Sequence, residues 1–166
     1  LFLLSGEEQL VAKLMRQLPE AGAYEVPEEL KEKIQSLFWA ACCGDDETKQ
    51  TIGRVWQEHH YLCDTHTAVA WNVAQQYKAA NPAHAPVVVL STASPYKFPA
   101  AVLEGLGEKA EGDEFAVMEQ LERLTGIPAP KNLRGLRERP VRHTTVLDRE
   151  EMLPFVLEKA QEKKWF

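Results

Sequence analysis

The feature that most limits the possible folds is a run of four apolar residues at 87–90, Val-Val-Val-Leu, which follows the helix-breaking pair Asn81-Pro82. Because no polar residue interrupts the run, it is typical of a strand that is covered on both faces in a parallel sheet. Such a strand needs neighbours, and only the runs at 37–43 and 141–147 are further strand candidates. We therefore predict an α/β fold, rich in helix and with a few parallel strands, whose sheet is completed by chain outside this sequence.

Apolar residues three and four positions apart predict that most of the remaining chain is helical. Capping residues and helix breakers set the expected ends of these helices. We expect helices from a capping box at Ser5 and Glu8 to before Pro19, from Pro27 through Ile34, from Asp45 to His59 or His60, from Asp64 or Thr65 past Tyr77, from about Phe98 to Leu106, and from Phe115 to a stop at Gly126.

The last part of the sequence is a basic segment followed by one more helix. Residues 131–147 contain several lysine and arginine side chains and adjoin prolines, and we interpret them as a solvated connection. Asp148 with Glu151 then predicts the cap of a last helix that runs through Ala160. Pro154 interrupts its pattern, so this helix either kinks or begins there.

Composition and charge limit the classes of function. We treat residues 1–166, which are 45% hydrophobic, as a single globular region. The net charge of −6 argues against nucleic acid as the main partner, and no apolar stretch is long enough to cross a bilayer. Three cysteines cannot form a secreted disulfide framework, which favours a cytoplasmic location. The sequence has neither an initial methionine nor a signal peptide, and we expect it to be part of a longer protein.

One histidine-rich segment, 59–66, resembles a metal site in its composition. His59, Cys63 and His66 have a spacing that zinc can use, although no second half of a metal motif follows. Cys63 and His66 can also be written as a nucleophile and its base. The simpler interpretation is that these histidines lie at helix ends and that Cys63 is a small core residue.

Hydroxyl side chains gather after the predicted strand at 87–90. Ser91, Thr92 and Ser94 follow its carboxyl end, which is the edge where open α/β sheets bind ligands. These neutral hydroxyls can hydrogen-bond a heterocycle without bringing a charge. Alternatively, they cap the next helix or satisfy the turn.

A second polar cluster lies at a predicted helix start. Asp64, Thr65, His66 and Thr67 occupy the first turn, where free backbone amides suit an anion and the helix dipole favours a neutral imidazole. The alternative is an ordinary helix cap beside a structural histidine.

Three blocks of this sequence, taken in order, resemble the bacterial and fungal type of threonine synthase. They are Asp-Asp-Glu-Thr at 45–48 with Thr51-Ile52, Tyr-Leu-Cys-Asp-Thr-His-Thr-Ala-Val-Ala at 61–70, and Val-Leu-Ser-Thr-Ala-Ser-Pro-Tyr-Lys-Phe-Pro at 89–99. The family usually has proline where Thr65 stands and histidine where Ser94 stands. The resemblance implies a pyridoxal-phosphate enzyme of fold type II, the tryptophan synthase β-like fold, and it identifies 1–166 as the C-terminal part.

The resemblance further implies the reaction and the roles of several residues. The family converts O-phospho-L-homoserine and water to L-threonine and phosphate, as a carbon-oxygen lyase of threonine biosynthesis. Thr92 would hydrogen-bond the pyridine nitrogen of the cofactor, with Ser91 as the second choice. Asp64, His66 and Thr67 would line or support the substrate site, and Lys97 would contact phosphate.

The resemblance also implies what these residues lack. In the family, the lysine that forms the Schiff base and the glycine-rich phosphate loop lie upstream, so 1–166 contains no catalytic lysine and would be inactive alone. Its expected partner is the N-terminal remainder of the same enzyme. Two alternatives from other classes stay open: a stand-alone binding module, which predicts a complete core without a large exposed apolar face, and a small zinc protein.

Overall fold

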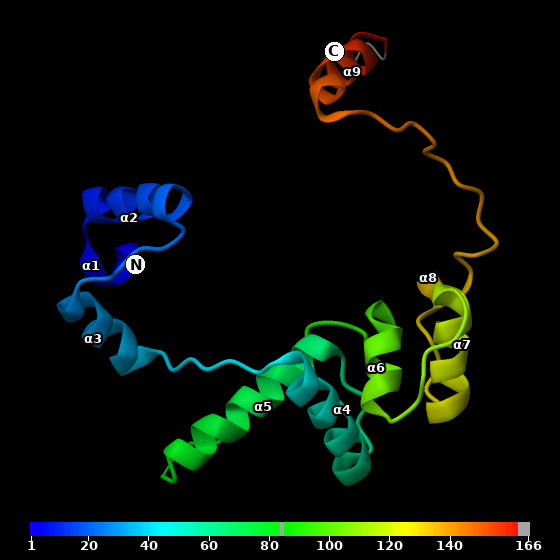
Figure 1. The fold of residues 1–166 in the computed structure, drawn as a ribbon, viewed down its shortest axis with the longest axis horizontal. Helices are drawn as coiled ribbons and strands as arrows, with labels where there is room; N and C mark the ends of the chain where they lie inside the picture. Colours follow the sequence, from blue (N-terminus) through cyan, green and yellow to red (C-terminus); the bar gives the residue numbers. More distant parts are fainter. Residues whose placement is uncertain (84, 163–166) are drawn as a thin grey trace. The chain divides into compact units, whose positions relative to one another are not determined.

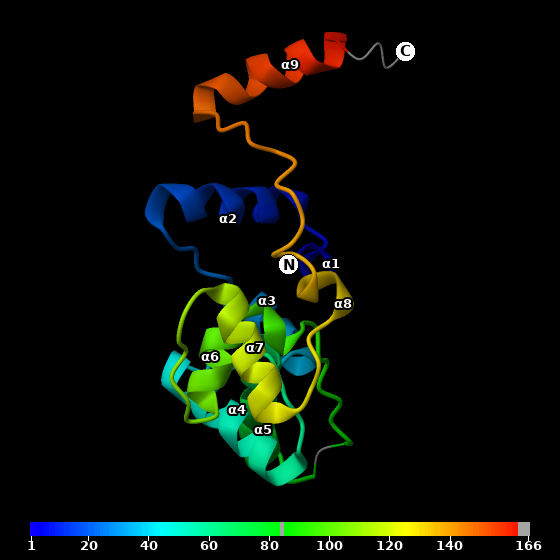
Figure 2. The same ribbon diagram turned by 90° about the vertical axis from the view of Figure 1, so that its right-hand side faces the viewer.

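The computed structural model describes residues 1–83 and 85–162, which form helices joined by irregular segments (Figure 1, Figure 2). The chain divides into two compact units, Leu1–Pro128 and Ala129–Phe166. The first unit contains α1 (Phe2–Ser5), α2 (Glu8–Ala21), α3 (Glu28–Leu37), α4 (Asp45–His59), α5 (Thr65–Ala80), the 3₁₀ turn η1 (Pro95–Lys97), α6 (Pro99–Gly105) and α7 (Glu114–Thr125). The second contains α8 (Lys131–Arg134), η2 (Arg149–Glu151) and α9 (Met152–Glu162).

Most predicted helix ends are confirmed. Asp64 caps α5, Gly126 ends α7 with a positive φ of 70°, and Asp148 forms a capping box with Glu151 at η2. Pro154 lies in the first turn of α9, where its missing N–H would have had no helical partner. Each of these ends depends on a side chain or glycine within a few residues of it, which explains why the sequence predicts it.

The predicted bounds of the first long helix are wrong. Ser5 ends α1 instead of capping α2, and its hydroxyl accepts a hydrogen bond from the backbone N–H of Glu7. The helix α2 also continues past Pro19 to Ala21. Because Pro19 lies in the last turn, its missing N–H interrupts the helix near the end, where few hydrogen bonds remain to be lost.

The helices α4, α5, α6 and α7 lie together (Figure 1), and they build the core of the first unit. The helix α4 packs on both α5 and α6, and α6 packs on α7. The buried apolar side chains of these four helices are Ile52, Val55, Ala68, Val102, Leu103, Val117 and Leu121. The α4–α6 contact is unusually close, since a Cβ added at Gly53 would lie 2.4 Å from the carbonyl oxygen of Gly105.

The prediction of strands is not met within the described residues. Residues 37–43, 87–90 and 141–147 contain no strand, and no backbone hydrogen bond joins 87–90 to another described segment. A strand exists only when its amides and carbonyls meet a neighbouring strand, and these residues have none. The described part is therefore helical.

The segment 87–91 nevertheless keeps the side-chain alternation of a strand. Val89 and Ser91 line a pocket, whereas Val88 and Leu90 are 81% and 72% exposed. Successive residues therefore face opposite sides, which is the period of an extended chain. The side with Val89 and Ser91 faces the helices of this unit, and the side with Val88 and Leu90 is exposed.

The second unit carries an apolar helix face. Met152, Leu153, Val156 and Leu157 of α9 are each more than half exposed. Spacings of one and four residues place these side chains on one stripe of the helix. In the described part of the chain, no helix combines the length and the hydropathy that crossing a membrane would require.

Candidate functional site

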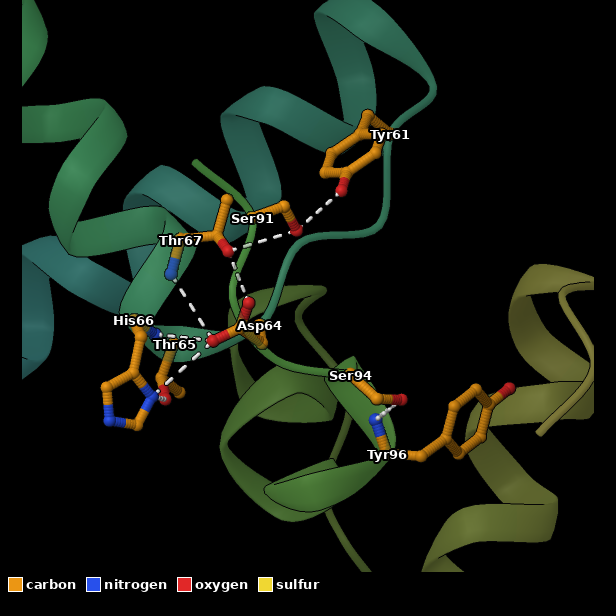
Figure 3. Close-up of polar contacts among 8 residues, drawn as sticks. All are labelled: Tyr61, Asp64, Thr65, His66, Thr67, Ser91, Ser94 and Tyr96. Carbon is orange, nitrogen blue, oxygen red and sulfur yellow. Dashed lines mark hydrogen bonds and ion pairs between the residues drawn. The ribbon is translucent and has the colours of Figure 1, made fainter. Parts of the chain in front are cut away.

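The N-terminus of α5 is organised by a fully buried carboxylate, that of Asp64 (Figure 3). Its Oδ1 accepts from the backbone N–H of His66 at 2.8 Å and from that of Thr67 at 3.3 Å. Its Oδ2 accepts from the hydroxyl of Thr67. Two of the free amides at the helix start, those of His66 and Thr67, are thus occupied by Asp64, so the predicted cap is confirmed and these two amides are not offered to an external anion.

A chain of hydroxyl groups leads from Asp64 to the segment after residue 90 (Figure 3). The Thr67 Oγ1 lies 3.3 Å from Ser91 Oγ, and the Tyr61 hydroxyl donates to Ser91 Oγ at 2.8 Å. Tyr61 and Ser91 are 30 residues apart. No local pattern links them, which is why the sequence did not reveal Tyr61 as part of this site.

This hydroxyl chain forms one wall of a pocket of about 290 Å³. Its hydroxyl groups come from Tyr61, Thr67 and Ser91, and its remaining lining residues are Val55, His59, Cys63, Trp71 and Val89. The His59 and Trp71 rings meet edge to face with centroids 5.2 Å apart. The pocket can therefore hold an apolar or flat group beside a few hydrogen-bonding hydroxyls.

A second pocket, of about 460 Å³, contains His66. The His66 side chain is 60% exposed, with Nδ1 3.4 Å from Asp64 Oδ1 and its ring centroid 5.5 Å from that of Phe98. Lys49 also lines this pocket, but its ammonium group already pairs with Glu104 at 2.7 Å. The accessible polar groups that line this pocket thus include the imidazole of His66 and the exposed carboxylate of Asp45.

The other predicted residues lie outside these pockets. Thr92 is exposed and has no hydrogen bond to the part of the chain that the structure describes. Lys97 is exposed, with Nζ 5.5 Å from the centroid of the Phe98 ring. Ser94 accepts from the backbone N–H of Tyr96 at 3.3 Å, so here the hydroxyl caps η1. Ser91 and Thr67 are brought together, whereas Thr92 and Lys97 are not.

The zinc alternative gains no support from this geometry. His59 and Cys63 line the smaller pocket, while His66 lines the larger one. Among the described residues, no group of three or more histidine, cysteine, aspartate or glutamate side chains could hold a metal ion. Burial raises the pKa of the Cys63 thiol to about 11, and the charge of Asp64 acts in the same direction. A thiol of this kind is a poor nucleophile and a poor metal ligand at neutral pH.

We expect Cys63 to resist alkylation in the folded protein. A pKa raised from 9.0 to about 11 lowers its thiolate fraction at pH 8, so iodoacetamide should modify the exposed Cys42 at least about tenfold faster. Because the folded state holds this proton more tightly than the unfolded state, the stability that Cys63 contributes should be lost as pH rises from 9 to 11. Peptide mass spectrometry measures the rates, and equal labelling of both cysteines before denaturation would contradict this expectation.

Comparisons with known proteins agree on one family. The family model described as "Threonine synthase, C-terminal" matches residues 67–156, more than half of the chain. Threonine synthase-like 2 of Pongo abelii is 36% identical over 103 residues, which are 61% of this chain and 21% of that protein. Threonine synthase of Pseudomonas aeruginosa is 32% identical over 110 residues, which are 65% of this chain and 23% of that protein.

A solved structure gives the same answer for the fold. The crystal structure of pyridoxal-phosphate-bound threonine synthase from Brucella melitensis matches with a TM-score of 0.71 and 29% identity, over 97% of this chain and 30% of that one. This chain thus spans only about a fifth of the length of the relatives above. The matched family model, the relatives and the fold together show that the chain belongs to the threonine synthase family, as its C-terminal region.

Proposed function

We propose that this chain is the C-terminal region of a pyridoxal-phosphate-dependent threonine synthase, which converts O-phospho-L-homoserine and water to L-threonine and phosphate. The observation that carries the proposal is the alternation at 87–92. Val89 and Ser91 line the pocket beside the helices, whereas Val88 and Leu90 are exposed. Continued alternation would direct the exposed Thr92 to the side of Val88 and Leu90. A hydroxyl group thus follows an uncovered apolar face, and we propose that the cofactor binds beside it.

The exposed segment 87–90 supports the proposal that a partner completes a sheet here. Residues 87–90 have no backbone partner in the described structure, and Val88 and Leu90 would each gain about 2 kcal/mol on burial. We assign this role to strands from the N-terminal remainder of the same enzyme, which gives the parallel α/β sheet expected from the apolar run. A stand-alone module would not leave an unpaired backbone segment with exposed apolar side chains of this kind.

The residues of this chain fit one side of the proposed cofactor. The Thr92 hydroxyl is neutral and accessible, and it can donate to an unprotonated pyridine nitrogen. When bound, the cofactor supplies an electron sink for substrate carbon atoms. The attaching lysine and the phosphate loop are assigned to the remainder of the enzyme.

Substrate contacts are assigned to the region around Phe98. The rings of His66 and Phe98 lie 5.5 Å apart, and Lys97 Nζ lies 5.5 Å from the same Phe98 ring. Two nitrogen donors thus flank one aromatic ring, and we propose that they contact the phosphate group of the substrate. Asp64 and Thr67 support this arrangement by holding the first turn of α5 in place.

The three free cysteines are consistent with the cytoplasmic location that we propose.

The proposed reaction is tested in the complete protein carrying its cofactor. The wild type should form threonine and phosphate in equal amounts from O-phospho-L-homoserine. Thr92→Ala should lower kcat about tenfold while the protein keeps its cofactor, because one ring contact is lost and the other attachments remain. Thr92→Ser should restore turnover.

The matched control is Thr145→Ala, which removes an exposed threonine hydroxyl from the second unit. It should leave turnover unchanged. Equal turnover of Thr92→Ala and wild type would remove Thr92 from the site. A wild-type protein that releases no phosphate from this substrate would overturn the proposed reaction itself.

A further inference from the structure

Ser91 is the anchor of the segment that carries Thr92. Among residues 86–93, the side chain of Ser91 makes the hydrogen bonds that reach another described segment, one to Tyr61 and one to Thr67 (Figure 3). The neighbouring backbone makes none. The position of Thr92, one residue further along the chain, is therefore governed by the groups that hold Ser91.

The carboxylate of Asp64 holds Thr67 in place, because the Thr67 hydroxyl donates to Asp64 Oδ2. The same hydroxyl is the donor in the longer, 3.3 Å contact with Ser91 Oγ. Ser91 Oγ also accepts from the Tyr61 hydroxyl at 2.8 Å. Ser91 is therefore held from two sides, by Tyr61 and by a Thr67 that the buried carboxylate fixes.

The hydroxyl of Ser91 is held within this unit by its contacts with Tyr61 and Thr67. The Thr92 hydroxyl, by contrast, has no partner in the described structure. Successive side chains of an extended segment also face opposite sides, so a Ser91 that faces α5 directs Thr92 away from it. The Ser91 hydroxyl thus anchors the segment, and the Thr92 hydroxyl is the one available to a ligand.

Tyr61 is well placed to hold Ser91. It lies in a short connection whose ends are both fixed, by His60 at the C-terminal cap of α4 and by Asp64 at the N-terminal cap of α5. His60 adopts a left-handed φ of 52°, which reverses the chain immediately before Tyr61. A stiff aromatic side chain on so short a connection presents its hydroxyl with little loss of conformational entropy.

From these contacts we propose that Tyr61 is a positioning residue, which acts through Ser91 to set the orientation of the Thr92 hydroxyl toward the cofactor. The inference rests on the proposed function for the identity of the group that Thr92 meets. The anchoring of Ser91 by Tyr61 is independent of that identity, and it can be measured without cofactor.

The first experiment is a double-mutant cycle in the complete holoenzyme. Tyr61→Phe keeps the ring and removes the hydroxyl, and it should lower kcat about fivefold, the effect of one hydrogen bond. In the Thr92→Ala background, Tyr61→Phe should have no further effect, because the group that Tyr61 positions is already absent. The exposed Tyr24 provides the matched control, and Tyr24→Phe should leave kcat unchanged. A further fivefold loss in the Thr92→Ala background would overturn the proposal.

The second readout is amide hydrogen exchange of residues 88–92 in the protein without cofactor. Tyr61→Phe should accelerate exchange there several-fold, whereas Tyr24→Phe should not. Unchanged exchange in Tyr61→Phe would show that Tyr61 does not anchor this segment, and would also overturn the proposal. If instead Thr92→Ala alone leaves kcat unchanged while Tyr61→Phe still accelerates exchange, the assignment of Thr92 fails and the anchoring by Tyr61 stands.

Discussion

Gly53→Ala is expected to destabilise the protein by about 3 kcal/mol, although alanine is the better helix former. The added Cβ would lie 2.4 Å from the carbonyl oxygen of Gly105, whereas unstrained contacts are about 1 Å longer. The obstructing atom belongs to the backbone, so it cannot rotate away, and α4 and α6 must move apart. The packing around the fully buried Ile52 and Leu103 would loosen with them.

The sign of this effect makes the experiment decisive. Helix propensity alone favours alanine over glycine by about 1 kcal/mol, so a solvent-exposed Gly53 would be stabilised by the same change. The matched control is Gly135→Ala, where no heavy atom lies within 4 Å of the added Cβ, and its stability should change by less than about 0.5 kcal/mol. Urea denaturation followed by circular dichroism measures both variants. An unchanged or increased midpoint for Gly53→Ala would refute the close packing of α4 on α6.

Asp64→Ala is expected to destabilise the protein by about 3–4 kcal/mol, the largest effect of a side-chain truncation that we predict. It removes the acceptor of two backbone amides and of the Thr67 hydroxyl in a site that is closed to water. An exposed helix cap contributes about 1 kcal/mol, and each buried group left unsatisfied adds about 1–3 kcal/mol. No buried polar side-chain atom among the described residues now lacks a partner, so the defect would be new.

Asp113 is the matched control, because it caps α7 by accepting from the Ala116 amide but lies at the surface. Asp113→Ala should cost about 1 kcal/mol. Equal costs for the two variants would show that burial of Asp64 adds nothing. Asp64→Asn removes the charge and keeps the shape of the side chain, and its amide oxygen can still accept from the first turn of α5. We expect it to keep α5 folded and to cost about 1–2 kcal/mol.

Helix ends in this protein were predictable where a nearby side chain sets them. Asp64 and Gly126 act on backbone groups within a few residues of themselves, so the local sequence holds the whole cause. The end of α2 was predicted wrongly because Pro19 is a strong breaker only in a helix interior, and its place in the last turn depends on where the chain finally leaves the helix.

The candidate site was predictable only in part. Asp64, Thr67 and Ser91 were identified from helix and strand ends, and the structure brings these three together. Tyr61 was missed because its contact with Ser91 joins segments 30 residues apart. The strand at 87–90 was inferred from an apolar run, yet the backbone partners that define a strand come from other segments, and none of the described segments supplies them.

Residues close together in the chain were enough to predict the periodicity of the helices and the caps that begin and end most of them. Short blocks read in order carried the resemblance to threonine synthase. Which hydroxyl is anchored, which pockets His59 and His66 line, and how closely α4 approaches α6 depend instead on tertiary packing. These are properties of segments that meet in space, and their energies depend on distances and burial that arise only when the helices pack.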